Sequence, residues 1–251
     1  MKFIASTTDA AGVRPFKDLY RQQANCQVIH FTSIDRGFTQ PYLLETGGRL
    51  AGYGAMFTKH YDPRVMEFYL FPEFESFASD AFRALLETSG AVEIEAQTNM
   101  PLANRMLEEF SVEIQEEARL FAVGQTTSIE IPEAIFRKRK PEDRLENHGE
   151  PEGDWVLEWD GRVVANGGFL THYNPPYGDI YMETAEPYRG RGFGKYLVQE
   201  LKRVCYEAGK LPAARCNPDN EASRRTILSA GFQEVGFLRC GKVNPKALNV
   251  R

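Results

Sequence analysis

Seven residues between a predicted strand and a predicted helix constrain this chain more than any other stretch. They read Arg189-Gly190-Arg191-Gly192-Phe193-Gly194-Lys195. The run 179–184 before them favours a strand, and the apolar stripe over 196–208 after them favours a helix. Three glycines leave backbone N–H groups uncovered by side chains, and the positive end of the helix dipole adds to them. The stretch therefore predicts an anion site, most simply a phosphate site.

Two other phosphate-binding loops fit these residues less well. A P-loop would need Ser or Thr after Lys195, where the chain has Tyr196. A dinucleotide loop would need Gly-x-Gly-x-x-Gly and an acid at the end of the next strand, but here the glycines alternate and that strand ends in Arg215-Cys216. A purely structural turn stays open as the remaining alternative.

Composition narrows the class of protein. The 251 residues carry a net charge of −5, which weighs against a nucleic-acid partner. No apolar run approaches the roughly 20 residues of a membrane-spanning helix, and the first residues lack the apolar core of a signal peptide. We therefore expect a cytoplasmic protein with no membrane partner. The 4 cysteines and 4 histidines are scattered without metal-ligand spacing, so we expect reduced thiols and no metal.

The chain reads as two similar halves. Gly48-Arg49 matches Gly161-Arg162, and Tyr69 matches Tyr181. The glycine loop has no counterpart, because the first half carries two acids and no glycine over 72–77. We expect an α/β (α+β) protein of two tandem domains, each a mixed, mostly antiparallel twisted sheet flanked by helices. The first, degenerate copy is placed at 1–130, a charged linker at 131–152 and the second copy at 153–251.

The residues around the loop resemble the GNAT superfamily of acyl-CoA-dependent N-acyltransferases. The run 189–194 fits its Arg/Gln-x-x-Gly-x-Gly/Ala loop. Downstream, Asn220-Glu221-Ala222-Ser223 resembles its Asn-x-x-Ala/Ser helix, and Ala230-Gly231-Phe232 resembles its terminal Gly-Phe. The resemblance covers about 153–240 strongly and the first half only in outline. It implies two GNAT-like domains, of which the second is intact.

The resemblance implies acetyl-CoA, or another acyl-CoA, as co-substrate. In the family the pyrophosphate binds the loop, and the pantetheine arm pairs with the strand before it. The expected cofactor-binding residues are therefore Met182, Thr184, Arg189, Gly190, Arg191, Gly192, Phe193, Gly194, Lys195, Asn220 and Ser223. Asn220 has an equally good alternative role as a helix N-cap.

Transfer of an acyl group to an amine requires a proton acceptor, because an ammonium ion has no lone pair. We expect Glu183 to serve, directly or through water, since it lies where the strand would meet the thioester. Strand alternation places Tyr181 on the same face. His172, in the preceding loop, is the next candidate.

The proton donor to the leaving thiolate is less defined. The family's usual tyrosine position is Ile227 here, so the thiolate leaves unprotonated, another group such as Tyr188 or Cys216 serves, or the protein does not catalyse. The leading function is acetyl transfer by direct attack in a ternary complex, and the alternative is a non-catalytic acyl-CoA-binding sensor or interaction module. The expected acceptor is a small-molecule or peptide amine, and a homodimer is left open.

Overall fold

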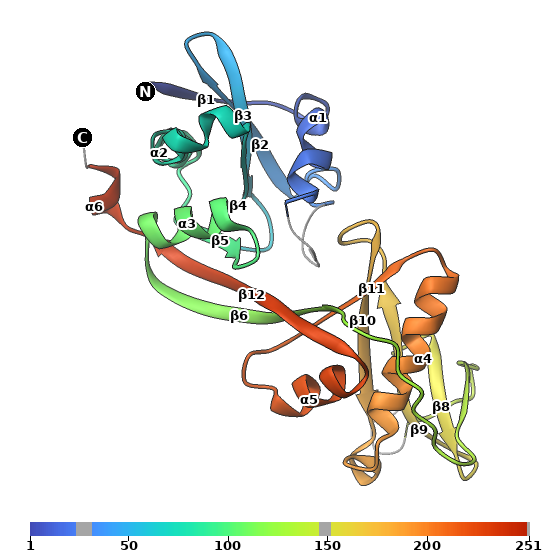
Figure 1. Ribbon diagram of the computed structural model, residues 1–251. Helices are drawn as coiled ribbons and strands as arrows, with labels where there is room; N and C mark the ends of the chain where they lie inside the picture. The colour runs from blue at the N-terminus through green and yellow to red at the C-terminus, as the bar shows by residue number, and fades with distance from the viewer. Residues whose placement is uncertain (24–31, 146–151, 250–251) are drawn as a thin grey trace. The chain divides into compact units, whose positions relative to one another are not determined.

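The computed structural model describes residues 1–23, 32–145 and 152–249, and the chain divides into two compact units (Figure 1). Unit 1 contains Met1–Ala118 and Gly236–Arg251, and unit 2 contains Arg119–Val235. This division differs from the predicted 1–130, 131–152 and 153–251 at both ends of unit 2. The C-terminal segment joins unit 1 because its strand pairs there, and Ile135–Lys138 of the predicted linker form a strand in the sheet of unit 2. Residues 146–151 of that linker lie outside the described residues.

Unit 1 is a mixed sheet with helices on both faces. Its strands occur in the order β1-β2-β3-β4-β5-β12, with β4 and β5 parallel and the other neighbours antiparallel. Helix α1 covers the face that carries Tyr53, through Phe16, and α2 covers the opposite face, where Phe82 packs on Phe68. The elements are β1 (Phe3–Thr7), α1 (Ala10–Arg21), β2 (Thr39–Thr46), β3 (Arg49–Phe57), β4 (Arg64–Leu70), η1 (Pro72–Phe77), α2 (Ala78–Ser89), β5 (Glu93–Gln97), α3 (Pro101–Phe110), β6 (Ser111–Val123), β12 (Phe232–Val243) and α6 (Pro245–Leu248).

Unit 2 repeats this architecture, as the sequence predicted. Its strand order is β6-β11-β10-β9-β8-β7, with β10 and β11 parallel and the other neighbours antiparallel. Helix α4 packs a buried apolar stripe, including Leu197, Leu201 and Cys205, against one face of this sheet. The further elements are β7 (Ile135–Lys138), β8 (Trp155–Trp159), β9 (Arg162–Leu170), β10 (Tyr177–Thr184), η2 (Glu186–Tyr188), α4 (Phe193–Glu207), β11 (Leu211–Cys216) and α5 (Glu221–Ser229).

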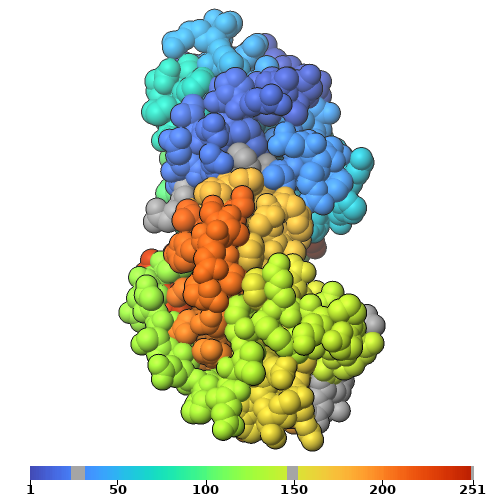
Figure 2. Space-filling view, turned by 90° about the vertical axis from the view of Figure 1, so that its right-hand side faces the viewer, coloured from blue at the N-terminus to red at the C-terminus, as the bar shows by residue number. Residues whose placement is uncertain are grey.

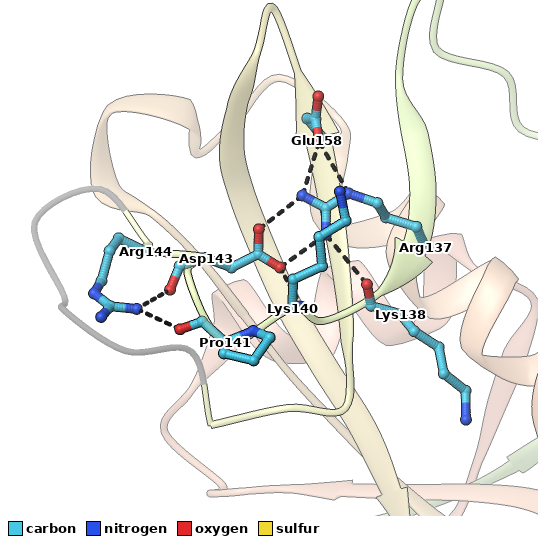
Figure 3. Close-up of polar contacts among 7 residues, drawn as sticks. All are labelled: Arg137, Lys138, Lys140, Pro141, Asp143, Arg144 and Glu158. Atoms are coloured by element: carbon cyan, nitrogen blue, oxygen red, sulfur yellow. Dashed lines mark hydrogen bonds and ion pairs between the residues drawn. The ribbon is translucent and has the colours of Figure 1, made fainter.

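The predicted charged linker contains the basic run 137–140, whose first two residues belong to strand β7. Figure 3 shows Arg137, on β7, between two carboxylates. Its guanidinium binds Asp143 at 2.7 and 2.8 Å and Glu158, on β8, at 2.8 and 2.9 Å. These bonds lower the pKa of Asp143 to about 2 and raise that of Arg137. The arginine is therefore neutralised within the sheet edge, which the charge pattern alone did not indicate.

The segment between β6 and β7 is held along α4 by two side chains of that helix. Gln199 accepts from the Ile129 N–H at 2.6 Å and donates to the Ile129 carbonyl at 3.0 Å. Lys202 donates to the carbonyls of Gln125 and Ala230 at 2.9 and 2.7 Å. Figure 2 shows this segment (yellow-green) at the surface beside α4 (orange). The segment belongs to unit 2, although the sequence places it at the end of the first copy and the start of the linker.

Strand registers identify which residues of the two units correspond. The Phe71 N–H donates to the Ala51 carbonyl at 2.9 Å, and the Ala185 N–H donates to the Val164 carbonyl at the same distance. Counting inward from these bonds, Tyr53 pairs with Tyr69 in unit 1, and Asn166 pairs with Glu183 in unit 2. The counterpart of Tyr69 is therefore Glu183. The sequence match of Tyr69 with Tyr181 was wrong by two residues, because it was based on residue identity rather than on register.

Unit 1 fills the positions that correspond to the candidate site with its own side chains. Tyr53 and Glu67 are buried, and the Tyr53 hydroxyl donates to Glu67 at 2.7 Å. Lys17 from α1 donates to the same carboxylate at 2.7 and 3.0 Å. In place of the glycine loop, η1 carries Glu73 and Glu75 in its first turn. The first copy thus lacks a phosphate loop and has a closed polar core at this position.

Three expectations from composition can be compared with the structure over the described residues. Cys205, Cys216 and Cys240 are free thiols, whereas Cys26 lies outside the described ranges. Over residues 1–23, 32–145 and 152–249, no helix is long and apolar enough to cross a membrane. In the same ranges, no group of three or more His, Cys, Asp or Glu side chains could hold a metal ion.

Candidate functional site

The loop between β10 and α4 presents backbone N–H groups at a helix N-terminus. Gly190 and Gly192 have φ of 74° and 90°, a left-handed conformation that glycine adopts without strain. Gly192 is the N-cap of α4 and has no side chain to cap it, and the first turn contains no acid. The first N–H groups of a helix lack intrahelical partners, so those of α4 remain available for an anion.

The first turn of α4 lies close to both β10 and α5. A Cβ on Gly194 would lie 3.2 Å from the Thr184 Oγ1 and 3.2 Å from the Thr226 Cγ2. Glycine therefore allows the helix N-terminus to approach the end of the strand, where a larger residue would push it away. Together, the glycines form a cradle that added side-chain atoms would fill.

Three basic residues surround this cradle, and two of them are fixed by contacts. The Arg189 Nε donates to the Thr184 carbonyl at 3.1 Å and so ties the loop to the end of β10. The Arg191 guanidinium lies 4.6 Å from the Trp159 ring centroid and also stacks near the Tyr188 and Phe193 rings. With Lys195, these side chains give the loop a positive field that an anionic group would enter.

Two adjoining cavities form a groove along β10. The first, about 710 Å³, opens over the loop and is lined by every predicted cofactor-binding residue. The second, about 280 Å³, lies where β10 and β11 part, since their pairing ends at Ile180 and Ala214. The two cavities share Met182, Asn220 and Ser223. We call the first the loop cavity and the second the strand cavity.

The structure brings two of the three predicted catalytic residues to this groove. Glu183 lines the loop cavity and Tyr181 lines the strand cavity, on the face of the sheet opposite α4. Burial raises the pKa of Tyr181, and the carboxylates of Asp154 and Glu152 raise it further, so the phenol keeps its proton. His172 is exposed, lies 4.2 Å from the Tyr173 ring and lines neither cavity.

Asn220 fulfils the N-cap role that the sequence left open. Its Oδ1 accepts from the Ser223 N–H at 3.0 Å at the start of α5, while both residues line the groove. Ile227, which replaces the family's usual tyrosine, is buried and lines the strand cavity. Cys216 lines the same cavity, and burial raises the pKa of its thiol. Tyr188 lines the loop cavity, with its ring buried.

An ion pair that sequence reasoning missed lies at the closed end of the groove. Asp179 on β10 binds the Arg215 Nε on β11 at 3.1 Å, and both side chains line the strand cavity. Burial raises the pKa of Asp179 to about 6, although the Arg215 charge opposes that rise. The Arg215 guanidinium also lies 4.9 Å from the Tyr173 ring centroid. In the sequence, this pair is visible only as an acid in one predicted strand and a base in the next predicted strand.

Known proteins share this architecture. Residues 122–232 match the family model of the acetyltransferase (GNAT) family. A GNAT-family acetyltransferase from Colwellia psychrerythraea superposes with a TM-score of 0.72 at 14% identity, covering 96% of this chain and 99% of that one. A GCN5-related N-acetyltransferase from Sphaerobacter thermophilus gives a TM-score of 0.61 at 15% identity, with 97% and 96% covered. No curated protein sequence matches this chain.

The tandem arrangement is also found among solved structures. A tandem GNAT protein from the clavulanic acid biosynthesis pathway has a TM-score of 0.58 at 12% identity, covering 97% of this chain and 99% of that one. At such identities the likeness is one of fold. It extends over both units, so the predicted fold of two GNAT-like copies is confirmed.

The buried Asp179 carboxylate predicts a specific dependence of stability on pH. Between the usual aspartate pKa of about 4 and the folded value of about 6, the native state binds more protons than the unfolded state. The free energy of unfolding of the wild type should therefore fall relative to that of Asp179→Asn as pH rises through this window, by about 2–3 kcal/mol, and not change further above it. Urea unfolding of both proteins at each pH measures the difference.

Asp154→Asn is the matched control, because it removes an exposed acid from the same unit. A free energy of unfolding of the wild type that stays constant, or rises with pH, relative to that of Asp179→Asn would contradict the assignment of a destabilising buried carboxylate.

Proposed function

We propose that unit 2, in which residues 122–232 match the family model of the GNAT acetyltransferases, binds acetyl-CoA and transfers its acetyl group to an amine. The family and the tandem fold support an acyl-CoA-dependent acyltransferase in general. The observation that carries the finer proposal is the groove, in which an anion cradle at a helix N-terminus adjoins the parting of two parallel strands.

The chemistry of the loop fits coenzyme A. The N–H groups at the start of α4, with Arg191 and Lys195, would hold the pyrophosphate, and glycine at 192 and 194 leaves it room. Past Ile180, β10 runs on without β11 beside it, so the pantetheine amides can pair along Met182–Thr184 as the resemblance implies. Acetyl-CoA supplies the activated acyl thioester at the far end of this arm.

The ion pair at the closed end of the groove supports a short acyl group. A long acyl chain would extend from the thioester toward Asp179 and Arg215, both of which line the strand cavity. Placing apolar atoms against a buried charge pair gains little and desolvates the charges further. We infer that acetyl is preferred to longer apolar acyl groups.

The proposed transfer is a direct attack within a ternary complex. Glu183 accepts a proton from the amine, the amine nitrogen forms a bond to the acyl carbon, and the bond from that carbon to sulfur breaks. The thiolate leaves, and Tyr181, whose phenol keeps its proton, is placed to donate to it. Asp154 and Glu152 act on Tyr181 with negative charge, which favours a cationic amine, either a small molecule or a peptide, as the acceptor.

A non-catalytic acyl-CoA sensor or interaction module is the second candidate. It is favoured by one observation, the buried Ile227 at the position of the usual tyrosine. Both candidates need the loop to bind coenzyme A, and they differ in turnover.

Binding is tested by changing one loop glycine. Gly192→Val should weaken acetyl-CoA binding by tenfold or more, since the side chain must occupy the cradle at a φ of 90°. Gly209→Val is the matched control, because Gly209 also has positive φ (69°) and lies outside both cavities. Calorimetric titration of the three proteins measures the effect. Equal affinities for acetyl-CoA would remove the loop from the proposed site.

Catalysis is tested by release of free thiol from acetyl-CoA in the presence of a panel of amines. We expect turnover above background with at least one amine, and a loss of about 10²–10⁴ in kcat/KM in Glu183→Gln, as is typical when a general base is removed. Glu186→Gln, an exposed neighbour in η2, should keep the wild-type rate. Binding of acetyl-CoA without acetylation of any amine would favour the sensor.

A further inference from the structure

One buried amide beside the candidate proton acceptor has an unused donor. Asn166, on β9, is 2% exposed, and its Oδ1 accepts from the Gly153 N–H at 3.0 Å. This bond fixes the amide orientation, because the atom facing an N–H donor must be the oxygen. The Nδ2 group then points away from Gly153, and among the described residues it has no hydrogen-bond acceptor. Leaving a buried donor unsatisfied costs stability, so such groups often serve function.

The strand register places this amide opposite the predicted base. Asn166 on β9 pairs directly with Glu183 on β10 in an antiparallel ladder. Directly opposed residues carry their side chains on the same face, with Cβ atoms about 4.5–5.5 Å apart. The two side chains therefore lie on one face of the sheet, with Asn166 within the length of the half-buried Glu183 side chain.

Unit 1 has a donor at the position of Asn166, and there it binds a carboxylate two residues before the counterpart of Glu183. Tyr53 is the counterpart of Asn166, and its hydroxyl donates to the carboxylate of Glu67 on the neighbouring strand at 2.7 Å. In unit 1 the carboxylate is buried and also bound by Lys17, so the arrangement is locked. In unit 2 a smaller amide replaces the phenol, and the facing carboxylate lines a cavity.

We propose that Asn166 is the positioning residue of the proton acceptor, donating from Nδ2 to the Glu183 carboxylate when that group is ionised and turned toward the bound amine. The inference rests on the proposed function of unit 2. It adds to the site a residue that lines neither cavity. The hydrogen bond fixes one carboxylate oxygen and leaves the other to accept the amine's proton. It also stabilises the ionised form that accepts the proton.

The test is a double-mutant cycle on kcat/KM. Asn166→Asp keeps the oxygen that accepts from Gly153 but replaces the donor with an ionisable oxygen, and it should lower kcat/KM about ten- to hundredfold in the wild type. In the Glu183→Gln background the same change should cost about twofold or less, because the charged partner is already absent. Asn166→Ala, which adds no charge, should behave in the same way. Asn104→Asp, on α3 of unit 1, is the matched control and should not alter the rate.

Equal losses from Asn166→Asp with and without Glu183 would show a merely structural role and overturn the proposal. The acid limb of the pH profile gives a second kinetic readout, and loss of the donor should move it to higher pH.

A measurement without turnover separates this inference from the proposed function. The Asn166 side-chain NH₂ signals, identified by their absence from the spectrum of Asn166→Asp, should move with pH more in the wild type than in Glu183→Gln, because only the wild type has an ionisable acceptor opposite Asn166. Equal movement in both proteins, or none in either, would overturn the proposal whether or not any amine is acetylated. Other charged or titratable groups lie around the face of the sheet that carries Asn166, and they are present in both the wild type and Glu183→Gln. They are Asp179, Tyr181, Arg215, Arg139, Glu152 and Asp154.

Discussion

The parting of two parallel strands is the constraint on which unit 2 depends. β10 and β11 pair only as far as Ile180 and Ala214, and beyond that point the sheet is open. The strand cavity and the buried Asp179–Arg215 pair lie at this opening, and the anion cradle follows at the end of β10. A continuous ladder would close the groove and leave the loop as an isolated anion site. The proposed acyl transfer depends on the opening between β10 and β11 lying next to the anion cradle.

The parallel strands part in both copies, because β4 and β5 pair only as far as Val65 and Ile94, so the two copies differ in their side chains rather than in the ladder. In unit 1, Tyr53 occupies the position of Asn166, and its hydroxyl joins Lys17 in binding a buried carboxylate. Such a network stabilises only when all its members are satisfied, and here they satisfy one another. In unit 2 the amide that replaces the phenol keeps an unused donor, and the neighbouring glutamate lines a cavity. Unit 1 thus has a closed polar core at the position where unit 2 has the candidate site.

The sequence was informative where the signal is local. Glycines at fixed spacing, charge and the following helix predicted the cradle, since backbone freedom and helix dipoles act within a few residues. It could not show partners that depend on strand register, such as Arg215 for Asp179 or Glu183 for Asn166. It also took the basic run 137–140 for a linker, because only the pairing of β7 with β8 brings Glu158 to Arg137. His172 had the right chemistry at a position that lines neither cavity.

Hydrogen–deuterium exchange on coenzyme A binding distinguishes the two copies, because both are observed in one experiment. We expect slowed exchange at the amides of Arg191–Lys195 and along Met182–Thr184. We expect no change over η1 and the start of α2, the corresponding stretch of unit 1. Protection in unit 1, or no protection at the start of α4, would contradict a coenzyme A site formed in one copy and lost from the other.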